Sequence, residues 1–239
     1  MSTIINYAPL LWQGLLVTLE LLVLGSALAL VIAFTAGLGR MSRHMALRAP
    51  AAIFIEVFRG TSMIVQLFWA YYALPLLGVE LPAFAVGVVV LAANEGAYAA
   101  EIVRGAIQSR AAGQTEACVA LGIPPAKRMR RILIPQSIPA MLPSFGNVLI
   151  DLLKNTSLVA TITVLDLTFQ GLTIRTSTGA TTAVFTTLLV VYFILSVLLG
   201  QMMKLLERRF AIDRTAKPLR SKLASLVRSE RASTGGSGT

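Results

Sequence analysis

The chain has 239 residues, of which 56% are hydrophobic and only 13% are charged, and its net charge at pH 7 is +10. Soluble domains carry about 25% charged residues, so this composition is typical of a membrane protein. One cysteine, Cys118, excludes an internal disulfide and a cysteine metal cluster, and one histidine, His44, leaves little for a histidine-based metal site.

Apolar runs dominate the chain, and a membrane-spanning helix needs roughly 20 mostly apolar residues. The first run holds Glu20 as its only charge, the second is entered through Glu56 and Arg59, and the last has no charge at all. In chain order the predicted spans are residues 11–38, 60–77, 83–100, 141–163 and 183–203. The sequence therefore predicts an all-α membrane protein with about five transmembrane helices.

Lysine and arginine alternate between the loops, and cytoplasmic loops carry the excess of these residues. They are present after the first span, absent after the second, abundant after the third, reduced to Arg175 after the fourth, and abundant again from Lys204. We therefore expect the N-terminus outside and the C-terminus in the cytoplasm. The basic charge is then a topology signal and not the mark of a nucleic-acid partner. A cleavable signal peptide is not expected, because the first residues lack a positive segment.

Two further segments complete the predicted organisation. Residues 1–210 are predicted to form a transmembrane domain whose long cytoplasmic loop, about 103–140, carries helix signals and prolines and is expected to be ordered. Residues 211–239 form a basic cytoplasmic tail ending in SERASTGGSGT, a composition that predicts disorder.

The stretch GQTEACVALGIPPAKRMRRILIP within that loop predicts a short, nearly uncharged helix. Gly113 opens it, Thr115 can cap its N-terminus, and Glu116 sits where the helix dipole favours an anion. Gly122 can take the left-handed position after the helix, and Pro124–Pro125 blocks continuation. Such a helix either docks into a groove on another protein or packs on its own bundle, and the residues alone leave both readings open.

Motifs for catalysis are missing from the sequence. It contains no G-x-x-x-x-G-K-[ST] phosphate loop, no HExxH, no CxxC and no G-x-S-x-G. An intramembrane enzyme would need a nucleophile and a base, for which no motif is visible. A membrane scaffold or sensor would not need charges within its spans.

Three stretches together resemble the permease subunits of ABC importers, in the polar amino-acid branch of the histidine and glutamine type. The loop offers Glu116-Ala117-Cys118, then Gly122, then Ile132-Leu133-Ile134-Pro135, which is similar to that family's EAA…G…I-x-L-P signature. EVFRGTSMIVQLF resembles its E-x-F-R-G-T-P-x-x-x-Q segment, and LLKNTSLVATI resembles its K-x-T-S-L segment. The chain departs at Cys118, Ser62 and Ile134, all of them small or apolar exchanges. The likeness runs from about residue 11 to 210.

The resemblance implies a type I ABC importer permease fold in a bacterial cytoplasmic membrane. It implies a second permease subunit, identical or homologous, two cytoplasmic ATPase subunits, and an extracytoplasmic solute-binding protein. It implies no cofactor in this chain, because ATP and magnesium would be bound by the ATPase. The cytoplasmic helix would be the coupling helix that sits in a groove of the ATPase, through Gly113, Gln114, Glu116, Ala117, Leu121 and Gly122. The solute would be a polar amino acid or a related zwitterion, including ectoine-like or opine-like compounds.

Charges within the spans are the candidates for the solute path, because an unpaired charge in lipid is costly and must face protein or water. Asp151 and Lys154 lie three residues apart on one helical face. They either pair with each other or line the path, where Asn94 and Glu95 could join them. Glu56 and Arg59 are also three apart, and we expect them to form an interfacial ion pair.

Overall fold

The computed structural model describes residues 6–110 and 112–210, and every regular element within them is helical. The predicted disordered tail, 211–239, lies outside the described residues. In chain order the elements are α2 (Ala8–Arg40), α3 (Met45–Gly60), α4 (Met63–Phe68), η1 (Trp69–Ala73), η2 (Leu74–Leu77), α5 (Ala83–Gln108), α6 (Ala112–Ala120), α7 (Pro125–Arg128), η3 (Met129–Leu133), α8 (Ile134–Asn155), η4 (Thr156–Ile162), α9 (Leu167–Thr178) and α10 (Thr181–Phe210). η1 and η3 are π-helical turns, whereas η2 and η4 are 3-10 helices.

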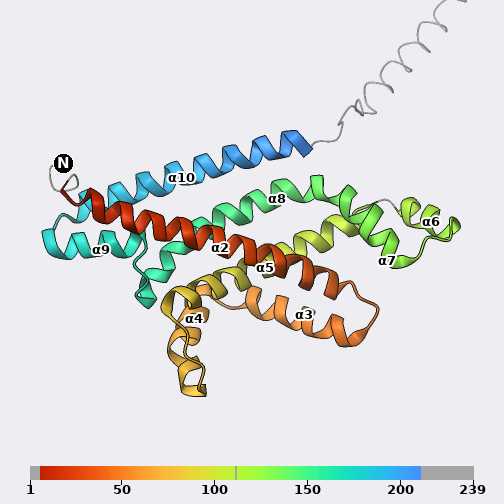
Figure 1. Cartoon of the computed structure of the whole chain (residues 1–239), viewed down its shortest axis with the longest axis horizontal. Coiled ribbons are helices and arrows are strands. Elements are labelled where there is room, and N and C mark those ends of the chain that lie inside the picture. The colour runs from red at the N-terminus through yellow and green to blue at the C-terminus, as the bar shows by residue number, and fades with distance from the viewer. Residues whose placement is uncertain (1–5, 111, 211–239) are drawn as a thin grey trace, which may run out of the picture.

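Long helices run along the long axis of the molecule, with α6 and α7 at the end opposite the N-terminus (Figure 1). Four helical stretches of the described residues are long and apolar enough to cross a membrane: α2, α5, the stretch Pro125–Ile162 that contains α8, and α10. A fifth crossing is possible if the bent pair formed by α3 and the segment Met63–Leu77 counts as one span. The predicted all-α membrane fold with about five spans is confirmed.

The second span differs from its prediction. The sequence predicts one continuous helix over residues 60–77, but α3 runs to Gly60 and the following segment, Met63–Leu77, is bent by 108° from it, as in a broken span or a re-entrant loop. Thr61 and Ser62 both have extended backbone angles, so the helix is interrupted where the predicted span was meant to begin. α3 contains charged residues that lower its mean hydropathy, so it does not stand out in the sequence as an apolar run.

The fourth crossing also changes character along its length. α8 ends at Asn155 and the chain continues as the 3-10 helix η4, whereas the sequence predicted one helix over 141–163. The short helix α9, which follows, was not predicted. Asp166 caps it by accepting hydrogen bonds from the backbone N–H groups of Phe169 (2.9 Å) and Thr168 (3.2 Å).

α5 is the most deeply buried helix of the bundle and contacts α2, α3 and α8. Small residues let α2 and α5 approach closely, as is common between membrane helices. A Cβ atom at Gly96 would lie 2.8 Å from the Ile32 side chain, and one at Gly37 would lie 2.8 Å from the Ala100 carbonyl oxygen. This central position of α5 presents its polar residues to α8 and to the break in the second span.

Candidate solute path and coupling helix

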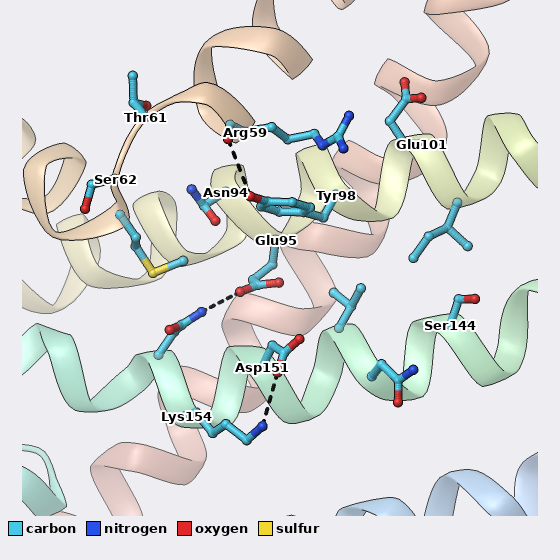
Figure 2. A pocket seen from close by; sticks show the side chains of 15 residues that line it. Arg59, Thr61, Ser62, Asn94, Glu95, Tyr98, Glu101, Ser144, Asp151 and Lys154 are labelled. Carbon is cyan, nitrogen blue, oxygen red and sulfur yellow. Dashed lines mark hydrogen bonds and ion pairs between the residues drawn. The ribbon is translucent and has the colours of Figure 1, made fainter.

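A cavity of about 820 Å³ lies between α5, α8 and the break between α3 and α4. Figure 2 shows side chains from α5 and α8 facing one another across it. The lining residues are mostly polar or charged: Arg59, Thr61, Ser62, Met63, Asn94, Glu95, Tyr98, Glu101, Ile102, Ser144, Asn147, Val148, Asp151, Lys154 and Asn155. A cavity of this polarity within a bundle of membrane helices is suited to a polar solute.

The four residues predicted from the sequence, Asn94, Glu95, Asp151 and Lys154, all line this one cavity. Lys154 Nζ lies 3.3 Å from Asp151 Oδ1, and the two side chains are 60% and 58% exposed. Ion pairs with such exposure contribute about 0–1 kcal/mol. Both groups therefore remain available to a third charged group.

Asn94 and Glu95 are buried on the opposite wall, at 5% and 4% exposure. Asn94 Nδ2 donates to the Phe58 carbonyl oxygen (2.9 Å) and to Gln66 Oε1 (3.0 Å), so its two N–H groups are used within the protein. Glu95 Oε1 accepts a hydrogen bond from Asn155 Nδ2 at 2.7 Å. Glu95 takes part in none of the ion pairs found among the described residues.

The predicted pair between Glu56 and Arg59 does not form. Glu56 Oε1 instead lies 2.9 Å from Nη2 of Arg40, which the antiparallel packing of α2 on α3 brings alongside. The Arg59 guanidinium carbon lies 5.2 Å from the ring centroid of Tyr98, a cation–π contact across the cavity wall. Sequence spacing could not predict the pairing of Glu56 with Arg40, because Arg40 belongs to another helix.

Glu101 is held by two arginines at the α6 end of the cavity. Arg104 donates to Glu101 Oε2 through Nε (3.0 Å) and Nη2 (2.7 Å), and Arg40 Nη1 lies 3.0 Å from Glu101 Oε1. Sequence reasoning missed Glu101, Tyr98 and Asn155 as lining residues. Helical spacing could have found Tyr98 and Asn155, since they lie three and four residues from Glu95 and Asp151 respectively.

α6 projects beyond the bundle with most of its surface uncovered (Figure 1). Leu121 and Val119 are 76% and 62% exposed, whereas Cys118 is buried. The predicted coupling residues are all exposed: Gly113, Gln114, Glu116, Ala117, Leu121 and Gly122. Exposed apolar side chains on a projecting helix favour contact with another protein.

The C-terminal end of α6 has the predicted geometry. Gly122 has φ +65°, its N–H donates to the Val119 carbonyl at 2.9 Å, and the Ile123 N–H donates to the Cys118 carbonyl at 2.9 Å. These two bonds form a Schellman motif with glycine in the left-handed position. The chain therefore turns sharply at Gly122 toward α7.

The N-terminal end of α6 differs from the prediction. The helix begins at Ala112, so Thr115 lies inside it and is not the residue before its first turn. For the same reason the first turn contains no acidic residue, and Glu116 is placed too far along for a strong interaction with the helix dipole.

Known proteins share this architecture and sequence. Residues 25–212 match the family described as "Binding-protein-dependent transport system inner membrane component". The chain is 39% identical to a probable amino-acid ABC transporter permease protein of Sinorhizobium fredii, covering 84% of this chain and 87% of that protein. It is 38% identical to the glutamine transport system permease protein of Escherichia coli, covering 85% and 94%.

Solved structures agree with the sequence relatives. The crystal structure of an amino acid ABC transporter with histidines superposes with a TM-score of 0.81 at 36% identity, covering 86% of this chain and 96% of that chain. The inward-facing MetNI methionine ABC transporter superposes with a TM-score of 0.75 at 21% identity, covering 86% and 98%, which supports the fold alone. The type I importer permease fold is confirmed.

The family match covers most of the chain and decides between the functions weighed above. A transport permease agrees with it, whereas an intramembrane enzyme and a membrane scaffold do not. The chain belongs to the family of inner-membrane components of binding-protein-dependent transport systems, and it is a multi-pass, non-catalytic permease subunit of an ABC importer.

Proposed function

We propose that this permease moves a polar amino acid or a related small zwitterion into the cytoplasm, through the cavity between α5 and α8. The observation that carries the proposal is the charge balance of that cavity. Glu101 is neutralised by Arg40 and Arg104, and Asp151 is paired with Lys154. The relatives named for amino-acid, glutamine, octopine and cystine transport support the same solute class.

After these pairs are removed, two lining residues of opposite sign remain outside every ion pair of the described residues. They are Arg59, on the wall formed by α3, and Glu95, on α5. A zwitterion offers a carboxylate to the first and an ammonium group to the second. The exposed pair of Asp151 and Lys154 can open to exchange partners with the same solute, and Asn94 shapes the wall beside Glu95.

The second permease subunit covers the open side of this cavity. Asp151 and Lys154 are more than half exposed on a helix within the membrane span, and lipid is a costly environment for either charge. A second copy, or a homologous permease, would shield them and enclose the solute between two subunits. The binding protein would deliver the solute from outside.

The coupling helix is α6, and its partner is an ATPase subunit, with one ATPase for each permease. The exposed residues Gly113, Gln114, Glu116, Ala117, Leu121 and Gly122 would occupy a groove in that partner, and the Schellman turn at Gly122 would set the angle at which the helix leaves it. ATP and magnesium would be held by the ATPase. Among the described residues, no group of three or more His, Cys, Asp or Glu side chains is arranged to hold a metal.

The proposed orientation has the N-terminus outside and the C-terminus in the cytoplasm of a bacterial cell. α6 lies at one end of the bundle and α9, which contains Arg175, lies at the N-terminal end (Figure 1). The sequence places Arg40 at the C-terminal end of α2 and Arg104 in the last turns of α5. In a Cys118→Ser background, Ser177→Cys should react with an impermeant thiol reagent from outside, and Ser109→Cys should not. Both side chains are exposed, so access decides the result. The reverse labelling pattern would refute this orientation.

Reconstitution tests the transport proposal. The permease would be placed in proteoliposomes with its ATPase and binding protein, and given radiolabelled L-glutamine, L-histidine, L-arginine, L-glutamate and ectoine. We expect ATP-dependent uptake of at least one of these zwitterions. Uptake of none, by a complex that retains its ATPase and hydrolyses ATP, would contradict the proposed solute class.

A further inference from the structure

The break between α3 and α4 leaves backbone groups that need hydrogen-bond partners. A helix end leaves up to four carbonyl groups without an intrahelical partner. Each unsatisfied backbone group costs several kcal/mol in the hydrocarbon region, where water is absent. α3 ends at Gly60 and α4 begins at Met63, so the carbonyl groups of the last turn of α3 need other donors.

Side chains supply these donors. Thr61 Oγ1 donates to the Val57 carbonyl oxygen at 2.7 Å. The Phe58 carbonyl oxygen accepts from both Gln66 Nε2 and Asn94 Nδ2, each at 2.9 Å. Tyr98 Oη donates to the Arg59 carbonyl oxygen at 3.4 Å, so three successive carbonyl groups each receive a side-chain donor.

Gln66 is the centre of this arrangement. Its amide nitrogen contacts the Phe58 carbonyl (2.9 Å) and Thr61 Oγ1 (2.7 Å), and its amide oxygen accepts from Asn94 Nδ2 at 3.0 Å. Gln66, Asn94 and the Phe58 carbonyl therefore form a closed triangle that joins α3, α4 and α5. We call this triangle the amide clasp. A network in which every member is satisfied rigidifies its surroundings, and loss of one member exposes the others.

The amide clasp lies next to residues that line the cavity. Arg59, Thr61 and Ser62 lie in the broken segment, and Asn94 and Tyr98 lie on the facing turn of α5 beside Glu95 (Figure 2). A change in the bend between α3 and α4 would therefore move the Arg59 side chain relative to Glu95. Gln66 itself does not line the cavity, so any effect that it has on the solute passes through these neighbours.

We infer that Gln66 is a positioning residue for transport: through the amide clasp it fixes the bend of the second span, and so holds Arg59 at its place across the cavity from Glu95. The inference rests on the proposed solute path. It assigns a role to the glutamine of the segment EVFRGTSMIVQLF, which coupling to the ATPase does not explain.

Spin labels measure this bend without any solute. In a Cys118→Ser background, labels at Ser62→Cys and Ser144→Cys lie on opposite walls of the cavity. The full complex should give one narrow distance distribution. Gln66→Met, which keeps the length of the side chain and removes the amide, should broaden or shift it. Gln201→Met, an exposed glutamine of α10 outside the cavity, is the matched control and should leave it unchanged.

Uptake kinetics separate positioning from simple structural damage. In the proteoliposomes described above, Gln66→Met should raise the KM for the transported zwitterions by about tenfold, which is 1.4 kcal/mol, with a much smaller change in kcat. The double variant Gln66→Asn with Asn94→Gln exchanges the two amide side chains. Its KM should be closer to the wild-type value than that of either single variant, because the two groups share one network. The double variant keeps both amide groups, so it tests the clasp even if Gln66→Met fails to assemble.

The possible outcomes separate the two proposals. Wild-type spacing between the labels and wild-type KM in Gln66→Met would overturn the clasp, as would a double exchange no better than its single variants. If the wild-type complex takes up none of the five solutes, the proposed solute class fails, while the spin-label distances still decide the clasp. Equal loss of kcat in Gln66→Met and Gln201→Met would assign the effect to general destabilisation and overturn the positioning role.

Discussion

The coupling helix α6 and the cavity between α5 and α8 use opposite physical means. α6 is mostly exposed and nearly uncharged, with one buried residue, Cys118, and a left-handed turn at Gly122. The cavity combines a buried polar group, Glu95, which accepts a hydrogen bond from Asn155, with the exposed ion pair of Asp151 and Lys154. A change in α6 should therefore disturb a contact with another chain, whereas a change in the cavity should disturb solute transport, and also the fold where it removes a buried hydrogen bond.

The largest effect is expected from exchanging the charges of the exposed ion pair. Asp151→Lys with Lys154→Asp retains a pair at the same spacing, so stability should change by less than about 1 kcal/mol. If these groups meet the solute, uptake should be abolished while the ATPase remains bound. Uptake and ATPase retention would be measured on the same vesicles. Normal uptake by the exchanged protein would remove both residues from the solute path.

Asn155 should be the next most sensitive position. Asn155→Leu removes the side chain that donates to Glu95, which is 4% exposed. A buried acceptor that loses its donor costs about 1–3 kcal/mol. Thermal unfolding of the purified complex should show this loss. Asn147→Leu, an exposed residue of the same cavity without a side-chain hydrogen bond among those found, is the control, and an equal loss there would contradict the argument.

Gly122→Val tests the other region. A β-branched residue at φ +65° is strained by about 1–2 kcal/mol, and an added Cβ would meet no atom within 4 Å, so the backbone alone carries the cost. We expect weaker retention of the ATPase and lower ATP-dependent uptake, with membrane insertion unaffected. Gly105→Val in α5 also meets no atom and has no left-handed φ, which makes it the matched control. Wild-type coupling in Gly122→Val would show that α6 does not need this turn.

The sequence was most informative where structure is determined locally. The turn at Gly122 and the long apolar helices α2 and α10 depend on residues within a few positions of one another. The break at Thr61–Ser62 could not be predicted, because two of the carbonyl groups before it accept hydrogen bonds from Asn94 and Tyr98, which are far away in the chain. The pairing of Glu56 with Arg40 was missed for the same reason, since tertiary packing replaced the expected local partner.

Glu116→Lys should have the smallest effect on the permease itself. Because α6 begins at Ala112, Glu116 lies beyond the first turn, where the helix dipole contributes little, and its side chain is exposed. Reversing its charge should therefore change thermal stability by less than about 0.5 kcal/mol, the range of ordinary surface substitutions. Any loss of uptake must then arise at the contact with the ATPase, through repulsion of a basic group there. Comparison of ATPase retention at low and high salt checks this, because screening at about 1 M salt limits such repulsion to roughly 3 Å. A loss that salt does not relieve would mean that Glu116 acts by shape, as Gly122 does, and not by charge.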